Sequence, residues 1–434
     1  MNTPLPKLLI VSRLVWDDNS NSNTLTNLFD GYDSDRIARI YIETKMPNTR
    51  CCHRFFQISE VSLIQRLFKW KTKTGHVIDT VRESIAQEKQ ERREQRLMGF
   101  ARRHRSFLLT ILRDILWSLD GWKTSELRSF ITDFNPDVVW LDGSPLILMN
   151  RLNNYVTSIA KKPSCTYLMD DVYTYKSCPS LLSKLYRFFL RKLVRTTVQN
   201  ASHVFVASEK MKEEYDRFFS INSTFLAKGA SAPLDTVESK EITNPIKFVY
   251  LGNVLIGRLD SLALLARAIH RINSAHEKRF ELWIYTSDFI SKTDYKKLVL
   301  DETIHLCGPV PYNEVNTIMQ DNDVVVFVEG LNNRYCRIAR LSFSTKIVDY
   351  ISSGKCIFTI GPADSAPVEY LKEHNISIVA HNESDIEDRL SRITIPQLKE
   401  YMNRSRCFAL SNHNKDAIQS RLYQKLKDVS LSQN

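Results

Sequence analysis

The sequence has no run of apolar residues long enough to cross a membrane. The strongly apolar segment Phe107–Leu119 is interrupted by Arg113 and Asp114, and it is shorter than the roughly 20 residues that a membrane-spanning helix needs. Near the N-terminus only Leu8–Val11 is continuously apolar, so we expect no signal peptide. These absences predict a protein that is soluble or peripherally attached to a membrane.

The sequence also lacks the paired cysteines and histidines of a metal or redox site. Of its eight cysteines only Cys51 and Cys52 are close together, and its ten histidines show no ligand spacing. Several cysteines lie in apolar runs, which is typical of reduced core residues and favours a cytoplasmic protein. The pairs Asp17-Asp18 and Asp170-Asp171 could gather a divalent ion, but nothing else supports one, so we expect neither metal nor cofactor.

Signatures of nucleic-acid binding are missing as well, although the formal net charge is +11. Residues 1–243 hold 36 Lys and Arg against 27 Asp and Glu, whereas residues 244–434 hold 24 against 22. No zinc finger, RNA-recognition signature or evident helix-turn-helix accompanies this charge, and the basic residues alternate with aliphatic ones. We therefore expect the first half to face an acidic partner other than nucleic acid.

Two segments of the first half combine basic with apolar residues. Between Lys89 and Arg105 there are seven basic residues against two acidic ones. The segment Lys184–Arg195 repeats basic residues along one face of an expected helix, at Lys184, Arg187, Arg191 and Arg195. Such helices suit the anionic surface of a membrane. The alternative is a solvated basic face on a helix that packs on the core.

Apolar runs of strand length alternate with helix-length segments in both halves, which is typical of parallel α/β sheets. A chain of 434 residues indicates two domains rather than one. The strands expected in the first half are Leu8–Ser12, Ile37–Ile42, Asp137–Leu141, Cys165–Met169, His203–Ala207 and Thr224–Ala227. Those expected in the second are Lys247–Leu251, Glu281–Tyr285, Ile304–Leu306, Val324–Phe327, Cys356–Ile360 and Ile376–Val379.

The segment Lys228–Pro245 separates the two series of strands, and its glycine and prolines mark it as a linker. The last segment, Ile395–Val429, has helical periodicity and no strand. We therefore predict an α/β protein with two tandem Rossmann-like domains, residues 1–243 and 244–405. A helical tail, residues 406–434, would pack back toward the first domain.

A helix start rich in hydroxyls stands near the end of the second domain. Ser344, Thr345 and Lys346 precede an apolar helical stretch, and Asp349 follows one turn later. Unpaired backbone N–H groups at a helix start, with hydroxyls and a lysine, suit a phosphate. Asp349 could accept two hydrogen bonds from a diol such as a ribose. The alternative is an ordinary capped helix with a Lys-to-Asp pair.

The second domain opens with a strand, a loop from Gly252 to Gly257, and a helix that starts near Arg258. This arrangement is a common phosphate cradle, although two glycines five apart also fit a plain strand-to-helix turn. The loop and the Ser344 helix should both project from the carboxyl ends of parallel strands, where open α/β sheets bind ligands. The two signals therefore converge on one crevice.

With the tandem layout and the helical tail, Gly252–Arg258 and Leu341–Gly354 resemble the donor-binding domain of GT-B glycosyltransferases, especially glycosyltransferase family 4. The resemblance implies a metal-independent hexosyltransferase that uses a nucleotide diphosphate sugar. Ser344, Thr345 and Lys346 would bind the donor diphosphate, Asp349 the ribose, and Arg258 the departing diphosphate. The remaining residues expected on the donor side are Gly252, Asn253, Gly257 and Ser342.

The sequence departs from the family pattern in three places. The first position of the family's paired-carboxylate pattern is Leu341 here, whereas the second is Asp349. Asn253 stands where arginine is frequent, and Leu259 stands where lysine is common. The resemblance therefore implies less positive charge at the leaving group, and no glutamate at the usual place near the donor sugar.

Acceptor-side candidates lie in the first domain. The loop after its first strand is polar, and its candidate residues are Asp17, Asp18, Asn19, Ser20, Asn23 and Thr24. A solvated turn with a helix cap is the alternative. Asp170 and Asp171 follow another strand, and one of two adjacent carboxylates could serve as acid or base. They could equally cap the next segment.

These observations predict a glycosyltransferase that moves a sugar to a hydroxyl acceptor, on a lipid-linked or growing surface-polysaccharide glycan, with retention of configuration. One alternative is an inverting enzyme that uses Asp17, Asp18, Asp170 or Asp171 as its base. Another is an inactive module that binds a nucleotide or a partner. The expected location is the cytoplasm, at the cytoplasmic face of a membrane.

Overall fold

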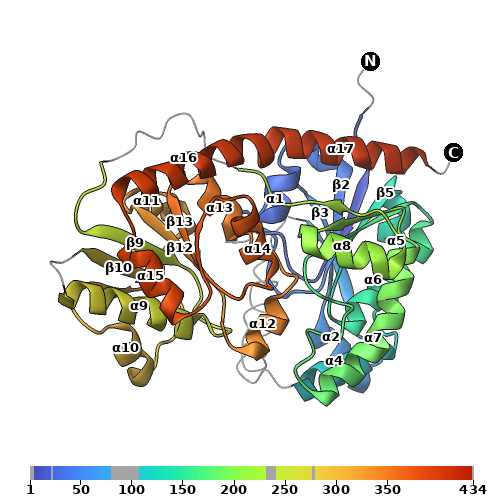
Figure 1. The fold of residues 1–434 in the computed structure, drawn as a ribbon. Coiled ribbons are helices and arrows are strands. Elements are labelled where there is room, and N and C mark those ends of the chain that lie inside the picture. The colour runs from blue at the N-terminus through green and yellow to red at the C-terminus, as the bar shows by residue number, and fades with distance from the viewer. Residues whose placement is uncertain (1–3, 21–22, 80–106, 231–240, 276–278, 433–434) are drawn as a thin grey trace.

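A computed structural model places two α/β domains side by side, and a pair of long C-terminal helices runs across both (Figure 1). The structure describes residues 4–20, 23–79, 107–230, 241–275 and 279–432. The basic segment Lys89–Arg105 lies outside the described residues. No helix among those described is both long and apolar enough to cross a bilayer.

The N-terminal domain is built on an eight-stranded sheet in the order β4-β3-β2-β1-β5-β6-β7-β8. Every neighbouring pair is parallel except β3 with β4. The central strand β1 has only buried residues, as expected of a parallel strand covered by helices on both faces. Its strands are β1 (Leu8–Val11), β2 (Ile37–Tyr41), β3 (Arg54–Ile58), β4 (Gly75–Asp79), β5 (Val138–Asp142), β6 (Ser164–Leu168), β7 (His203–Val206) and β8 (Thr224–Phe225).

Two of these strands, β3 and β4, were missed by the reading of the sequence. β4 begins with a glycine and has only two apolar residues, so its own pattern is weak and its pairing with β3 makes it a strand. β3 has three apolar residues in five, and its pairing with β2 and β4 fixes it as a strand.

The C-terminal domain contains a six-stranded, wholly parallel sheet in the order β11-β10-β9-β12-β13-β14. Its strands are β9 (Ile246–Leu251), β10 (Phe280–Tyr285), β11 (Ile304–Cys307), β12 (Val324–Val328), β13 (Cys356–Ile360) and β14 (Ile378–Ala380). The strand order reverses between β9 and β12, so the loops after these two strands diverge and leave a crevice. The predicted class, two Rossmann-like α/β domains with terminal helices, is confirmed.

Helices cover both sheets, and several begin at side-chain caps; Ser208, for example, accepts a hydrogen bond from the Met211 amide. In the N-terminal domain the helices are α1 (Thr24–Phe29), α2 (Glu60–Phe68), α4 (Phe107–Ser118), α5 (Ser125–Phe134), α6 (Ile147–Ala160), α7 (Leu181–Gln199) and α8 (Glu209–Phe219), with the short turn η1 (Ser34–Arg36). In the C-terminal part they are α9 (Arg258–Ala275), α10 (Lys292–Leu298), η2 (Tyr312–Glu314), α11 (Val315–Gln320), α12 (Asn333–Ala339), α13 (Lys346–Ser352), α14 (Ala366–Glu373), α15 (Glu383–Ser391), α16 (Ile395–Asn412) and α17 (Lys415–Leu431).

A short segment of the C-terminal domain, Arg340–Phe343, is anchored on the N-terminal domain. The buried Arg340 guanidinium binds both carboxylate oxygens of Glu214 on α8, at 2.5 and 2.7 Å. The Ser208 hydroxyl donates to the Leu341 carbonyl at 2.9 Å. The ring of Phe343 lies edge-on to Phe225. This segment therefore ties the two domains together just before the chain enters α13.

Helix α17 closes the structure by returning to the N-terminal domain (Figure 1). It buries Ile418, Leu422, Leu426 and Val429 in the same apolar cluster as β1 and β5. The Tyr423 hydroxyl donates to the Leu28 carbonyl of α1 at 3.1 Å. The terminal helix thus contributes to the core of a domain that begins about 400 residues earlier in the chain.

We predict that Leu422→Ala lowers the free energy of unfolding of the N-terminal domain by about 2–4 kcal/mol, because it leaves a cavity in a packed core. Leu431→Ala is the matched control, since Leu431 lies on the same helix but is 67% exposed. Urea unfolding followed by tryptophan fluorescence measures both. Equal effects of the two substitutions would contradict the packing described.

Candidate functional site

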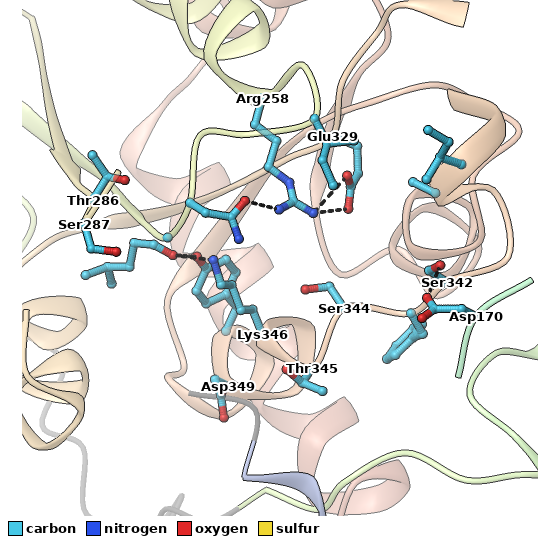
Figure 2. A pocket seen from close by; sticks show the side chains of 18 of the residues that line it. Asp170, Arg258, Thr286, Ser287, Glu329, Ser342, Ser344, Thr345, Lys346 and Asp349 are labelled. Carbon is cyan, nitrogen blue, oxygen red and sulfur yellow. Dashed lines mark hydrogen bonds and ion pairs between the residues drawn. The ribbon is translucent and has the colours of Figure 1, made fainter. Parts of the chain in front are cut away.

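A cavity of about 900 Å³ lies between the two domains, at the carboxyl ends of the strands of the C-terminal sheet. The loops after β9, β10, β11 and β12, together with the start of α13, form most of its wall (Figure 2). The N-terminal domain adds Pro145, Asp170, Asp171, Ser177 and Arg187. This is the place where an open α/β sheet binds its ligand.

Arg258, the first residue of α9, projects into this cavity. Its guanidinium donates to the Asn253 side-chain oxygen at 2.7 Å and to both Glu329 oxygens at 3.2 Å (Figure 2). Glu329 follows directly after β12 and is only 4% exposed. Burial raises the pKa of Glu329, while the charge of Arg258 opposes this shift. Arg258 is therefore held by a buried carboxylate.

Glu329 was not among the residues predicted from the sequence. A signal was present, because an acidic residue directly follows an all-apolar strand, Val324–Val328, in the domain of the Gly252 loop. Its significance depends on the strand order, which puts β12 next to β9. That neighbourhood cannot be read from local sequence.

Lys346 stands at the start of α13, but its side chain turns back toward β9. The ammonium donates to the Leu251 carbonyl at 2.9 Å and lies 5.6 Å from the centre of the Tyr250 ring. Burial lowers the pKa of Lys346 to about 8, and repulsion by Arg258 acts in the same direction. A Cβ atom on Gly252 would lie 1.7 Å from this ammonium, so any larger residue there would have to displace the Lys346 side chain.

Asp349 lines the cavity one turn further along α13. Its two carboxylate oxygens lie 2.6 and 2.7 Å from the ammonium of Lys228, whose side chain is only 2% exposed. Lys228 comes from the segment between the domains and was not predicted as a site residue. The partner of Asp349 is thus a buried lysine from outside its own helix.

The serine and threonine side chains before α13 have separate positions. Ser344 and Thr345 line the cavity, and Thr345 makes no side-chain cap to the helix. The Ser342 hydroxyl donates to Asp170 of the N-terminal domain at 2.7 Å (Figure 2). The predicted residues Ser342, Ser344, Lys346, Asp349 and Arg258 are therefore brought to one cavity.

Leu341 explains why the carboxylate of the family pattern is absent at this position. Its side chain is fully buried in an apolar cluster of the N-terminal domain with Leu168, Val172 and Tyr215. A carboxylate placed there would lose its hydration without gaining a partner. Glu329, directly after β12, instead places a carboxylate in the cavity wall next to Arg258.

The adjacent residues Asp170 and Asp171 have different environments. Asp171 is buried and accepts hydrogen bonds from the amides of Tyr173 and Thr174 and from the Tyr215 hydroxyl, at 3.2, 2.8 and 3.0 Å. Its neighbour Asp170 is exposed toward the cavity. Asp171 therefore serves the turn after β6, which was the structural alternative, and Asp170 is the carboxylate that a ligand can reach.

The polar loop after β1 is not part of the cavity wall. Asp18 accepts from the Thr26 hydroxyl at 2.6 Å and from the Arg50 amide at 3.1 Å. Asp17 accepts from the Asn48 side chain at 3.2 Å and from the Asn19 amide at 3.1 Å. The remaining candidates of this loop, Ser20, Asn23 and Thr24, are likewise outside the wall. The loop thus binds to its own domain.

Other wall residues were not predicted. Thr286 and Ser287 follow β10, and Pro309 and Val310 follow β11. They add a mixed polar and apolar surface beside the Gly252 loop. Among the described residues, no group of three or more His, Cys, Asp or Glu side chains is placed to hold a metal ion.

Comparisons with known proteins identify the fold. No protein-family model matches the sequence, and no curated protein has a significant sequence match to it. Solved structures, in contrast, match nearly the whole chain. HepE from Anabaena, crystallised with UDP-glucose, is 10% identical with a TM-score of 0.61, over 98% of this chain and 100% of HepE.

Two further structures are similar to the same extent. The α,α-trehalose 6-phosphate synthase from Burkholderia multivorans is 9% identical with a TM-score of 0.59, over 99% of this chain and 100% of the synthase. WaaG, a glycosyltransferase involved in lipopolysaccharide biosynthesis, is 9% identical with a TM-score of 0.59, over 96% of this chain and 99% of WaaG. The chain therefore has the GT-B fold, as predicted; at such low identity the likeness shows the fold alone.

The packing of Lys346 against Gly252 leads to a prediction. Gly252→Ala should push the ammonium away from the Leu251 carbonyl toward solvent, so the pKa of Lys346 should rise from about 8 toward its ordinary value of 10.5. Competitive amine labelling across a pH series, read by mass spectrometry, measures this pKa. Gly308→Ala is the control, because no atom lies near its Cβ position. An unchanged pKa in Gly252→Ala would refute the contact.

Proposed function

We propose that this protein is a glycosyltransferase that moves a sugar from a nucleoside diphosphate sugar to a hydroxyl group of an acceptor. The observation that carries the proposal is the meeting of Arg258 and Lys346 in one interdomain cavity, at the carboxyl ends of parallel strands. Two cations in one crevice suit a diphosphate leaving group. The neighbours of the same fold include glycosyltransferases, which supports this class of reaction.

In the proposed reaction the acceptor oxygen forms a bond to the anomeric carbon, and the bond from that carbon to the diphosphate breaks. The electron pair stays on the diphosphate, where Arg258 and Lys346 stabilise the growing negative charge. Preorganised donors of this kind contribute several kcal/mol to a transition state. Asn253 is uncharged at a position where the family often has arginine. Lys346 supplies the missing positive charge, because its ammonium lies against the Gly252 loop.

The two acidic residues have different proposed roles. Asp349 accepts hydrogen bonds from the ribose hydroxyls, and Lys228 keeps its carboxylate charged and oriented. Glu329 neutralises Arg258 before the donor arrives. When the diphosphate takes over Arg258, Glu329 becomes free to bind hydroxyls of the donor sugar, the task for which Leu341 is unsuited.

The wall formed by Thr286, Ser287, Pro309 and Val310 is proposed to hold the nucleobase. UDP-glucose is the first donor to test, since HepE was crystallised with it.

The proposed acceptor is a lipid-linked or growing surface-polysaccharide glycan. The involvement of WaaG in lipopolysaccharide biosynthesis and the exposed basic residues Lys184 and Lys192 of α7 support this proposal, together with a location on the cytoplasmic face of a membrane.

We propose retention of configuration, with the acceptor proton passing to the departing diphosphate. An inverting reaction would instead need a base on the acceptor side. Of the four carboxylates considered for that task, Asp17 and Asp18 lie outside the cavity wall and Asp171 is engaged in its turn, so Asp170 is the one suited to it.

We predict that Arg258→Ala and Lys346→Ala each lower kcat by about 100- to 1,000-fold, because each removes a preorganised donor from the leaving group. Arg392→Ala, at a surface position 73% exposed, is the control. Release of nucleoside diphosphate, measured with and without a chelator, also tests independence from metals. Normal turnover of both site variants would refute the mechanism, whereas nucleotide binding without turnover by the unaltered protein would indicate a binding module.

The stereochemical prediction is tested with Asp170→Asn. A retaining enzyme should keep its product anomer and lose less than about tenfold in kcat, because the departing diphosphate takes the proton. NMR of the anomeric proton in the first product identifies the anomer. An inverted product together with a loss of about 100-fold or more would establish Asp170 as the base of an inverting reaction.

A further inference from the structure

Exposed apolar side chains gather at one end of the N-terminal domain. More than half of the large hydrophobic side chains that are exposed in the described residues lie on α2, α4 and α7 or directly after them. These side chains are Ile64, Leu67, Phe68, Trp70, Leu108, Leu109, Leu112, Ile115, Leu119, Leu181, Leu182, Leu185, Phe188 and Phe189. Figure 1 shows the three helices together, on the side of the domain opposite α17. We call this surface the apolar edge.

A groove of about 450 Å³ opens on the apolar edge between α4 and α7, with the start of α6 behind it. Its walls are mostly apolar: Phe107, Ile111, Ile115, Leu182, Leu185, Phe189 and Leu193. Two of its polar side chains, Tyr186 and Asp114, are bound to each other and to backbone amides. The Tyr186 hydroxyl donates to Asp114 at 2.6 Å and accepts from the Ile147 amide at 3.0 Å, and Asp114 accepts from the Leu148 amide at 2.8 Å. The groove therefore suits a hydrocarbon rather than a polar ligand.

The exposed charges on the three helices and on the segment after α2 are basic, and the exposed carboxylate after α4, Asp120, is paired with Lys123. Lys184, Lys192 and Arg195 are exposed on α7, and Lys69, Lys71 and Lys73 are exposed after α2. The only acidic residues of the three helices, Glu60 and Asp114, are buried. Lys192 and Arg151 line the groove itself, and within the described part of the chain neither makes an ion pair. This surface is complementary to an anionic one.

The outer surface of α7 differs from the one expected from the sequence. Arg187 is buried and donates to the Asp171 carbonyl at 2.8 Å, and the Arg191 guanidinium lies 4.1 Å from the centre of the Tyr173 ring. Of the expected basic face, Arg187 is therefore buried in the domain, and Arg191 packs against Tyr173 at partial exposure. The face left to the outside is apolar, with Lys184 and Lys192 beside it.

We infer that the groove between α4 and α7 binds a hydrocarbon chain of an anionic membrane phospholipid, whose phosphate group pairs with Lys192 and Arg151. The side chains of the apolar edge enter the same membrane around it. Apolar burial combined with attraction of lysines to anionic headgroups is the ordinary basis of peripheral attachment. The absence of exposed acidic groups on these helices favours a membrane over a protein surface. The inference extends the proposed membrane attachment and does not depend on sugar transfer.

The first test is co-sedimentation of the full-length protein with phosphatidylcholine vesicles, with and without about one third phosphatidylglycerol, in the absence of any donor. We expect binding to the anionic vesicles and at least about tenfold weaker binding of the double variant L185D/F189D, which introduces two charges into the apolar edge. Lys192→Ala should weaken binding about fivefold. The matched control is Phe289→Asp, whose side chain is 93% exposed on the other domain.

The second test isolates the groove. Short-chain phosphatidylglycerol, below its micellar concentration, should form a one-to-one complex in native mass spectrometry and raise the melting temperature, whereas glycerol phosphate should do neither. Ile111→Trp fills the groove and should abolish the complex. Leu185→Trp provides a second groove variant on the exposed wall, and circular dichroism verifies that both are folded.

Vesicle binding by L185D/F189D as strong as that of the unaltered protein would overturn the inference. So would binding of glycerol phosphate as tight as that of the lipid. A third contrary outcome is that the protein does not bind vesicles but self-associates, and that Phe189→Asp abolishes this self-association. Donor turnover with a soluble acceptor should be unchanged in the edge variants, because none of the substituted residues lines the interdomain cavity. Failure of lipid binding is thereby distinguishable from failure of the proposed sugar transfer.

Discussion

The site depends on one short stretch of chain, Arg340–Lys346, which leads from contacts with the N-terminal domain to the wall of the interdomain cavity. The buried ion pair between Arg340 and Glu214 fixes its beginning, and the Leu341 side chain is sealed in the core of the other domain. Within a few residues the chain reaches Ser344 and then Lys346. Any change in the relation between the domains must therefore move the start of α13, because packed interfaces do not deform continuously. The interdomain contacts and the wall of the cavity therefore share one segment.

Charge balance is the second constraint on the cavity. Each cation already has a partner: Arg258 has Glu329, Lys228 has Asp349, and Lys346 has a backbone carbonyl. These pairings keep buried charges from being left uncompensated, which would cost several kcal/mol each. They also mean that an incoming diphosphate has to compete with a carboxylate for Arg258. The site is therefore preorganised for an anion, yet electrically balanced before one arrives.

Helix α7 links the two surfaces that the N-terminal domain offers. Toward the cavity it presents Arg187, which holds the turn that contains Asp170 and Asp171. Toward the outside it presents Leu185, Phe188 and Phe189. A membrane bound on the outer face and an acceptor bound at the inner face would be one helix diameter apart, on the order of 10 Å. Under the proposed function, α7 would therefore hold the membrane close to the acceptor.

The sequence by itself determined the class of fold and the half of the site that lies within local motifs. Alternating apolar runs predicted two Rossmann-like domains, and the short segments around Arg258 and Lys346 predicted where an anion would bind, because strand ends and helix starts are local features. The tertiary structure alone decided which side chains pair with Arg258 and Asp349. Glu329 lies 71 residues from Arg258 and Lys228 lies 121 residues from Asp349, and strand order and domain packing bring these pairs together. The tertiary structure also decided that Asp171 is buried while Asp170 is exposed, and that Arg187 is buried. Burial depends on neighbours from distant parts of the chain, which no local sequence pattern contains.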